Sequence, residues 1–134
     1  MTDFKFSVPI QPRFADFDML GHLNNATYVT YYEVARLNYF YEIGWTLKDA
    51  TNVVAHFDID FLLPILPDSE VLCSIKTISL GSKSFQMQYA LTSLDGSRIF
   101  SRAHSVQVCV DKNSGKAILI PDNVRELLSN YESI

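Results

Sequence analysis

The sequence predicts an α+β fold in which a long central helix is wrapped by an antiparallel sheet of five or six strands. Residues 25–43 read as a helix that is apolar around most of its circumference, and such a helix is covered by other structure. Most of the remaining chain reads as strand-like runs joined by short turns, which require antiparallel neighbours. The length of 134 residues suits one folded unit, so we expect a single domain over residues 1–134.

Hydrophobic periodicity and turn residues place the elements in chain order. Residues 4–14 read as a strand, and a polar break over residues 16–24 leads into the helix, which Gly44 ends. Alternation of apolar and polar residues is clearest over residues 84–92, as in a sheet with one buried face. The later elements are strands at 53–63, 70–80, 83–94 and 98–111, a short run at 116–120 and a helix at 122–131.

Composition and charge argue against several classes of function. The net charge of −4 and pI of about 5.2 disfavour a nucleic-acid binder, which needs a basic surface. No apolar run approaches the ~20 residues that span a bilayer, and the N-terminus lacks the order of a signal peptide, so we expect a cytoplasmic protein. Cys73 and Cys109 lie in separate apolar runs without zinc-site spacing, which indicates buried thiols.

The predicted architecture also suggests self-association. One helix against one sheet makes two layers, and an open sheet has edge strands that need cover or pairing. We therefore expect dimerisation through sheet edges.

The stretch DFDMLGHLNNATY, residues 16–28, concentrates polar groups just before the long helix. If Asn24 is the N-cap, its side chain accepts a hydrogen bond from an N–H further along, and the Asn25 N–H has no partner inside the helix. That free donor lies at the positive end of the helix, where it suits a developing oxyanion. Capping and catalysis are therefore compatible in this stretch.

Four stretches of the chain together resemble the hotdog-fold acyl-CoA thioesterases, in particular the 4-hydroxybenzoyl-CoA thioesterase-like group. They cover nearly the whole chain and are RFADFDMLGHLNNATYVTYYEVAR, VVAHFDIDFLLPILPDSEV, SKSFQMQYAL and VCVDKNSGKAILIPDNVRELL. The most specific part is the spaced series Asp18, Gly21, His22, Asn24, Asn25 and Tyr28. The resemblance implies a hotdog fold and hydrolysis of acyl-CoA thioesters to a carboxylic acid and coenzyme A. It further implies no metal or organic cofactor, and a homodimer or homotetramer with sites at the dimer interface.

The resemblance implies roles for the loop residues. Asp18 matches the catalytic carboxylate, which acts either as a general base on water or as a nucleophile that forms a mixed anhydride; we favour the base. The Asn25 N–H matches the donor that polarises the thioester carbonyl, and Gly21 and Asn24 belong to the substrate-binding loop. His22 either contacts the thioester region and holds Asp18 or packs the loop against the helix.

Two further carboxylates are expected to be structural. Asp16 lies near the helix N-terminus, where a negative charge stabilises the helix dipole without doing chemistry. Some hotdog thioesterases use a helix carboxylate, for which Glu33 is the candidate, but Arg36 is placed to form an i,i+3 ion pair with it.

Other substrate contacts are expected outside the loop. Tyr28, the helix tyrosine nearest the loop, is expected to line the acyl pocket. His56 lies in the second strand, where the family often brings residues towards the partner subunit's site, although a structural histidine is equally consistent with this position. The phosphates of coenzyme A call for exposed cations, for which Lys83 with the adjacent Ser84, or Arg102, are the candidates.

Two other functions stay open. A hotdog hydratase or dehydratase would also act on an acyl thioester, but its Asp and His have a spacing unlike that of Asp18 and His22. A non-catalytic acyl-CoA-binding module would keep the fold without turnover, and the presence of both Asp18 and Gly21 argues against it.

Overall fold

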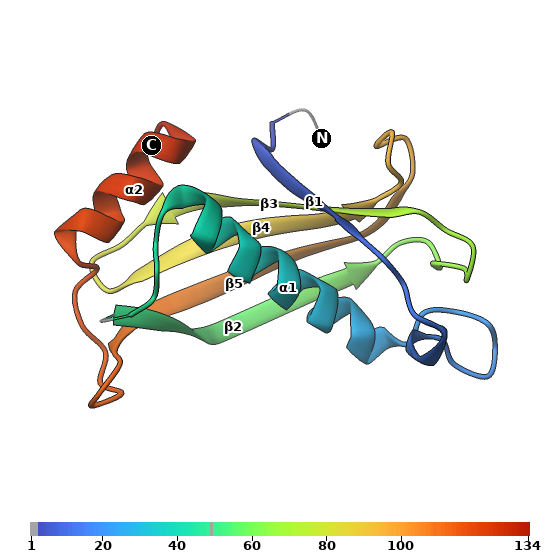
Figure 1. The fold of residues 1–134 in the computed structure, drawn as a ribbon, viewed down its shortest axis with the longest axis horizontal. Coiled ribbons are helices and arrows are strands. Elements are labelled where there is room, and N and C mark those ends of the chain that lie inside the picture. The colour runs from blue at the N-terminus through green and yellow to red at the C-terminus, as the bar shows by residue number, and fades with distance from the viewer. Residues whose placement is uncertain (1–2, 49) are drawn as a thin grey trace.

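The computed structural model describes residues 3–48 and 50–134 and folds them into an antiparallel sheet with a long helix across one face (Figure 1). The α+β prediction with a central helix and an antiparallel sheet is confirmed, and the sheet has five strands. The elements are β1 (Phe6–Ile10), the short 3-10 helix η1 (Phe14–Asp16), α1 (Asn25–Ile43), β2 (Ala50–Phe61), β3 (Val71–Leu80), β4 (Ser84–Thr92), β5 (Ile99–Asp111) and α2 (Asp122–Glu132).

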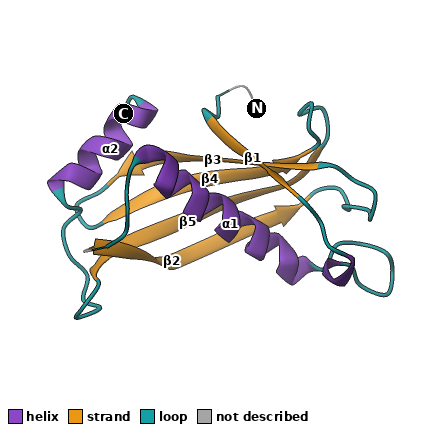
Figure 2. Ribbon diagram, in the orientation of Figure 1, coloured by secondary structure: helices purple, strands orange, loops and turns teal. Residues whose placement is uncertain are grey.

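The strand order is β1-β3-β4-β5-β2, so β1 and β2 form the two edges of the sheet. All neighbouring strands are antiparallel. The face towards α1 is apolar, and the alternation predicted for β4 is confirmed, because Phe85, Met87, Tyr89 and Leu91 are buried in the core. Figure 2 shows α1 running across the sheet, with α2 beside it at the end of β3.

The predicted bounds of α1 are confirmed at both ends. The Asn24 side chain caps the N-terminus by accepting a hydrogen bond from the Ala26 N–H. Gly44 ends the helix with a φ of 97°, which a residue with a side chain rarely adopts, and its N–H donates to the Phe40 and Tyr41 carbonyls. Both caps are local features, which is why the sequence places them correctly.

Only one side of α1 is covered within the chain. Tyr32, Ala35 and Tyr39 are completely buried against the sheet, whereas Val34, Leu37 and Tyr41 on the other side are 45%, 46% and 60% exposed. The predicted covering of the helix by the sheet is confirmed, and the five-stranded sheet of one chain covers one side of it.

The largest differences from the predicted strands concern β1, β2 and the run at 116–120. β1 stops at Ile10, because the chain then turns into η1, where the Asp16 carboxylate accepts a hydrogen bond from the Arg13 N–H. β2 covers Ala50–Phe61 rather than 53–63. The run at 116–120 is no strand; only Ala117 forms a bridge, with Val110.

Both cysteines are free and buried, as predicted for core thiols. Burial raises the pKa of the Cys109 thiol to about 11, and it raises the pKa of Cys73 as well. Among the described residues, neither helix is both long and apolar enough to cross a membrane.

One carboxylate joins α2 to the core by hydrogen bonds, in addition to the packing of its buried Val124 and Leu128. Glu132 Oε2 accepts hydrogen bonds from the Tyr39 hydroxyl at 2.6 Å and from the Thr77 N–H at 3.0 Å. These bonds join α2 to both α1 and β3. Burial and the hydrogen bond to Glu132 raise the pKa of Tyr39, so this phenol stays a donor.

We expect Tyr39→Phe to destabilise the protein by about 1–3 kcal/mol, because Glu132 and Thr77 would lose a hydrogen-bond partner in a buried setting. Urea unfolding measures the effect. Tyr131→Phe is the matched control, since the Tyr131 ring packs edge-on against Tyr39 while its hydroxyl makes no hydrogen bond within the described residues. Equal stability of the two variants would contradict the role given to Glu132.

Candidate active site

The loop before α1 is a small closed turn. Phe17 and Leu23 form an antiparallel bridge, and inside it the Asp18 N–H donates to the His22 carbonyl at 2.9 Å. Gly21 has a φ of 78°, and its N–H donates to the Asp18 carbonyl. A residue with a side chain would be strained at this φ, which explains the glycine of the motif.

The Asp18 carboxylate is anchored through one oxygen. Its Oδ1 accepts hydrogen bonds from the Leu20 N–H at 2.9 Å and from the His22 N–H at 3.2 Å. Its Oδ2 accepts none within residues 3–48 and 50–134. The side chain is exposed, so it has a fixed orientation and a free oxygen that water can reach.

Asp16 has a different environment from Asp18. It is 2% exposed, and its Oδ2 accepts hydrogen bonds from the Tyr31 hydroxyl at 2.7 Å and the Arg13 N–H at 2.8 Å. The Arg13 guanidinium contacts Oδ1 at 2.9 Å. Burial alone would raise the pKa of Asp16, but the hydrogen bonds from Tyr31 and Arg13 outweigh it and lower the pKa. Asp16 is therefore a structural residue, through these partners more than through the helix dipole.

The N-terminus of α1 carries an unpaired donor. The Asn24 cap satisfies the Ala26 N–H, and the Thr27 N–H donates to the Asn24 carbonyl. The Asn25 N–H has no hydrogen-bond partner in the described part of the chain. It lies at the positive end of a helix of 19 residues.

A pocket of about 310 Å³ opens beside this helix end. Tyr28 forms part of its wall, is 3% exposed and packs edge-on against Phe61 with 4.9 Å between ring centroids. Burial raises the pKa of the Tyr28 phenol, so the ring stays neutral. The lining residues are His22, Leu23, Asn25, Tyr28, Phe61, Leu62, Leu63 and Pro64.

The structure thus brings three predicted site residues, His22, Asn25 and Tyr28, around one pocket. Asp18 stands beside it, bonded to the backbone of His22, and Asn24 caps the adjoining helix. The wall formed by residues 61–64 was not predicted from the sequence. The apolar run FLLPIL, which starts at the last residue of β2, is the signal that could have indicated it, because a proline in such a run argues against a longer paired strand.

Four other candidates lie away from this pocket within one chain. Lys83 and Ser84 are at the β3–β4 turn, at the opposite end of the sheet from the N-terminus of α1 (Figure 1). His56 and Arg102 are exposed and alternate with the inward residues of β2 and β5, so they occupy the face away from α1.

Glu33 forms the expected ion pair with Arg36, at 3.8 Å. The Arg36 guanidinium also donates to the Tyr89 hydroxyl at 3.1 Å, which joins α1 to β4. A second hollow, of about 400 Å³, runs along the open side of α1, and Glu33, Leu37 and Phe40 are in its lining.

Comparison with known proteins decides the family. Residues 12–128 match the thioesterase-like superfamily. The chain belongs to this superfamily. The resemblance to hotdog-fold thioesterases is therefore confirmed for family and fold.

Several known proteins are similar to this chain over nearly its whole length. The uncharacterized protein YsmA of Bacillus subtilis (strain 168) is 36% identical over 129 residues, which are 95% of this chain and 87% of YsmA. A thioesterase from Thermus thermophilus, solved in complex with coenzyme A and Zn, is 34% identical with a TM-score of 0.88, covering 100% of this chain and 99% of its own. Slr0204 of Synechocystis, a 1,4-dihydroxy-2-naphthoyl-CoA thioesterase, shares the fold at 18% identity, with a TM-score of 0.83 over 93% and 96% of the two chains.

We expect Asp16→Ala to destabilise this thioesterase-like protein by about 1–3 kcal/mol at pH 7, because the buried Tyr31 hydroxyl loses its acceptor. Since the folded pKa of Asp16 is lowered, its contribution is complete above the unfolded value of about 3.9 and is lost as pH falls through the folded pKa. Urea unfolding between pH 7 and about pH 3 should therefore show the variant approaching wild type in acid.

Asp68→Ala is the control for this series, because Asp68 is exposed and makes no side-chain hydrogen bond in the described residues. It should stay within about 0.5 kcal/mol of wild type. A constant deficit of the Asp16 variant at every pH would show that its carboxylate charge does not stabilise the fold.

Proposed function

We propose that this protein hydrolyses acyl-CoA thioesters to a carboxylic acid and free coenzyme A. The observation that carries the proposal is the unpaired Asn25 N–H, which lies at the start of α1 and beside a pocket, next to a carboxylate anchored through one oxygen. The superfamily and the coenzyme A complex of the Thermus thermophilus thioesterase support coenzyme A thioesters as the substrate class.

In the proposed reaction the thioester carbonyl oxygen accepts a hydrogen bond from the Asn25 N–H. Attack on the carbonyl carbon places negative charge on that oxygen, and a fixed donor at a helix N-terminus stabilises such a charge. One such donor is worth about 10²–10³ in kcat. The acyl group would extend along Tyr28 and Phe61, whose rings form the apolar part of the pocket.

Asp18 acts as the general base in this scheme. Its free Oδ2 takes a proton from a water molecule while the water oxygen attacks the carbonyl carbon. Collapse of the tetrahedral intermediate breaks the C–S bond, and Asp18 gives the proton it took from water to the leaving coenzyme A sulfur. The His22 N–H holds Asp18 Oδ1, and the residue itself borders the pocket, so His22 positions the base.

The working unit is proposed to be a homodimer, alone or as half of a homotetramer. Within the described residues, the apolar side of α1 is open and the outer edge of β2 has no strand beside it. Leu37 on α1 is 46% exposed and Val54 on β2 is 41% exposed, so pairing of two chains would bury apolar surface and close a sheet edge. Lys83 and Ser84, which are remote from the pocket in one chain, are proposed to serve the partner's site. His56 lies on the sheet face away from α1 and is not assigned to that site.

We expect Asp18→Asn to lower kcat by ~10²-fold or more, which is about 2.7 kcal/mol of transition-state stabilisation. The asparagine oxygen can still accept from the Leu20 and His22 N–H groups, so the turn should persist while the base is lost. A thiol-release assay over short, long and aromatic acyl-CoAs measures the change.

Asp95→Asn is the matched control, because Asp95 also caps a glycine turn by accepting from an N–H two residues on, that of Ser97. It should turn over like wild type. Undiminished activity of Asp18→Asn would exclude Asp18 as the base and direct attention to Glu33 or His22. Hydration of crotonyl-CoA, or tight acyl-CoA binding without thiol release, would favour the hydratase or the binding module instead.

We expect Leu37→Glu to shift the protein from dimer to monomer and to reduce thioesterase activity in parallel. A charge in the centre of the open side of α1 would have to be buried without a partner on pairing. Light scattering coupled to size exclusion, together with the thiol-release assay, measures both effects. Leu119→Glu, at a 64% exposed leucine outside the helices and strands, should stay dimeric; a dimeric Leu37→Glu would contradict this interface.

A further inference from the structure

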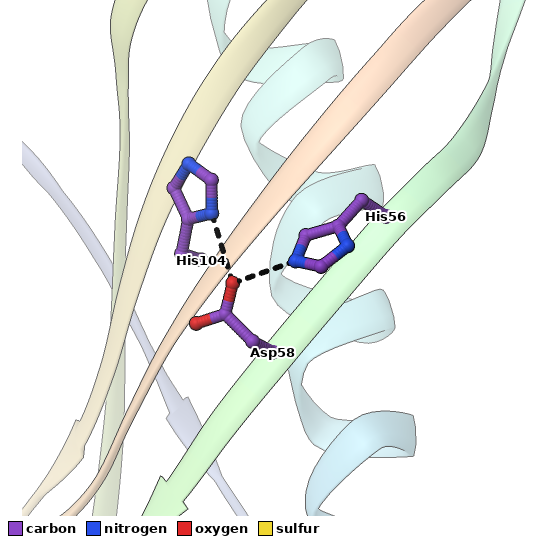
Figure 3. Close-up of side chains that lie close together, drawn as sticks. All are labelled: His56, Asp58 and His104. Atoms are coloured by element: carbon purple, nitrogen blue, oxygen red, sulfur yellow. Dashed lines mark hydrogen bonds and ion pairs between the residues drawn. The ribbon is translucent and has the colours of Figure 1, made fainter.

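A cluster of three metal-binding side chains lies on the face of the sheet away from α1 (Figure 3). His56 and Asp58 are two residues apart on β2, so both point to the same side of the strand. Asp58 is the register partner of His104 on the neighbouring β5. In Figure 3 the three side chains stand in front of the strands, whereas α1 lies behind them.

The three side chains converge on a single point. Asp58 Oδ2 lies 2.9 Å from His56 Nε2 and 3.1 Å from His104 Nδ1, and all three ligand atoms are within 4.8 Å of one another. Zinc–nitrogen and zinc–oxygen bonds of about 2.0–2.1 Å in a tetrahedron separate ligand atoms by about 3.4 Å. Small side-chain rotations would therefore place a Zn²⁺ ion at bonding distance from all three.

A fourth residue orients one of the histidines. Gln86 Oε1, on β4, lies 2.8 Å from His104 Nε2. When Nε2–H donates to this oxygen, the lone pair of Nδ1 is directed towards Asp58. Ligating histidines typically donate their other N–H to such an acceptor, which fixes the tautomer that binds the metal.

The charges at the cluster also favour a cation. Two imidazole nitrogens face the same carboxylate oxygen, so a proton or a metal ion has to lie between them and it.

We propose that His56, Asp58 and His104 bind a divalent transition metal ion, with Zn²⁺ as the ion of choice. Two imidazoles and one carboxylate suit Zn²⁺ far better than Mg²⁺ or Ca²⁺, which prefer all-oxygen sites. Because the His56 and Asp58 side chains are each 59% exposed, a fourth position is open to water or to a ligand from outside the chain.

This site is separate from the proposed catalytic pocket, because the two lie on opposite faces of the sheet. The ion would join the edge strand β2 to β5, between which Asp58 and His104 are already paired. No metal was expected from the sequence, because the resemblance implies none and the cysteines lack zinc-site spacing. Asp58 and His104, which the fold pairs, are 46 residues apart in the chain.

Calorimetric titration of the full-length protein, stripped with a chelator, with ZnCl₂ tests the proposal. We expect one Zn²⁺ per chain. His104→Ala and Asp58→Asn should each abolish this binding, and Gln86→Leu should weaken it by about 10–100-fold, as changes to an orienting partner do. Cobalt(II) substitution should give the visible spectrum of a site with nitrogen and oxygen ligands and no thiolate.

Two control variants make the result specific. His22→Ala removes the third histidine of the chain, and Asp60→Asn removes a neighbouring exposed carboxylate on β2; both should bind Zn²⁺ like wild type. Circular dichroism of each metal-free variant should match wild type, because the altered side chains lie on an open face. Absence of saturable binding, retention of it in His104→Ala, or its loss in His22→Ala would overturn the assignment.

Discussion

Three buried tyrosine hydroxyls on α1 fix the position of the helix, and the rest of the structure depends on that position. A buried hydroxyl is costly without a hydrogen-bond partner, so each one holds the helix to a particular place. The partners belong to three different parts of the chain: the loop, the sheet and the C-terminal helix. The bonds run from Tyr31 to Asp16, from Tyr32 to Ser101 on β5, and from Tyr39 to Glu132 on α2. Apolar packing alone would allow α1 to slide along the sheet, whereas these bonds set its register.

Of these three bonds, the bond from Tyr31 to Asp16 has the most direct effect on the candidate site. The Asp16 side chain accepts from Tyr31 on the helix, while its carbonyl accepts from the Asn24 N–H at the cap. One residue thus holds both the body and the beginning of α1 against the loop. The orientation of the Asn25 N–H follows from this, because the cap decides where the first free donor of the helix points. Asp16 therefore contributes to the site by fixing the loop against the helix, whereas Asp18 is exposed in the same loop.

Features set by neighbouring residues could be predicted from the sequence, and features set by distant residues could not. The bounds of α1 were predicted because Asn24 and Gly44 are local caps. The buried bond from Asp16 to Tyr31 was missed because it joins loop to helix across 15 positions. The open side of α1 was also missed, because periodicity shows that a surface is apolar but not whether the same chain covers it. The pocket wall at residues 61–64 depends on where β2 ends beside the helix, which is a tertiary property.

The histidine cluster was also not predicted, because a bulge in β2 changes which residues of the strand face outwards. Before the bulge Asn52 faces the core, where it accepts a hydrogen bond from the buried Gln107. Strict alternation from Asn52 would turn His56 and Asp58 inwards as well. The register shift between Val54 and His56 inserts one residue and reverses the alternation, so Phe57 packs on Tyr32 while His56 and Asp58 face outwards. The same reversal brings Phe61 to Tyr28 in the pocket wall. One extra residue therefore places Phe61 in the pocket wall on one face of the sheet and the metal ligands on the other face. Both sites depend on the same strand register.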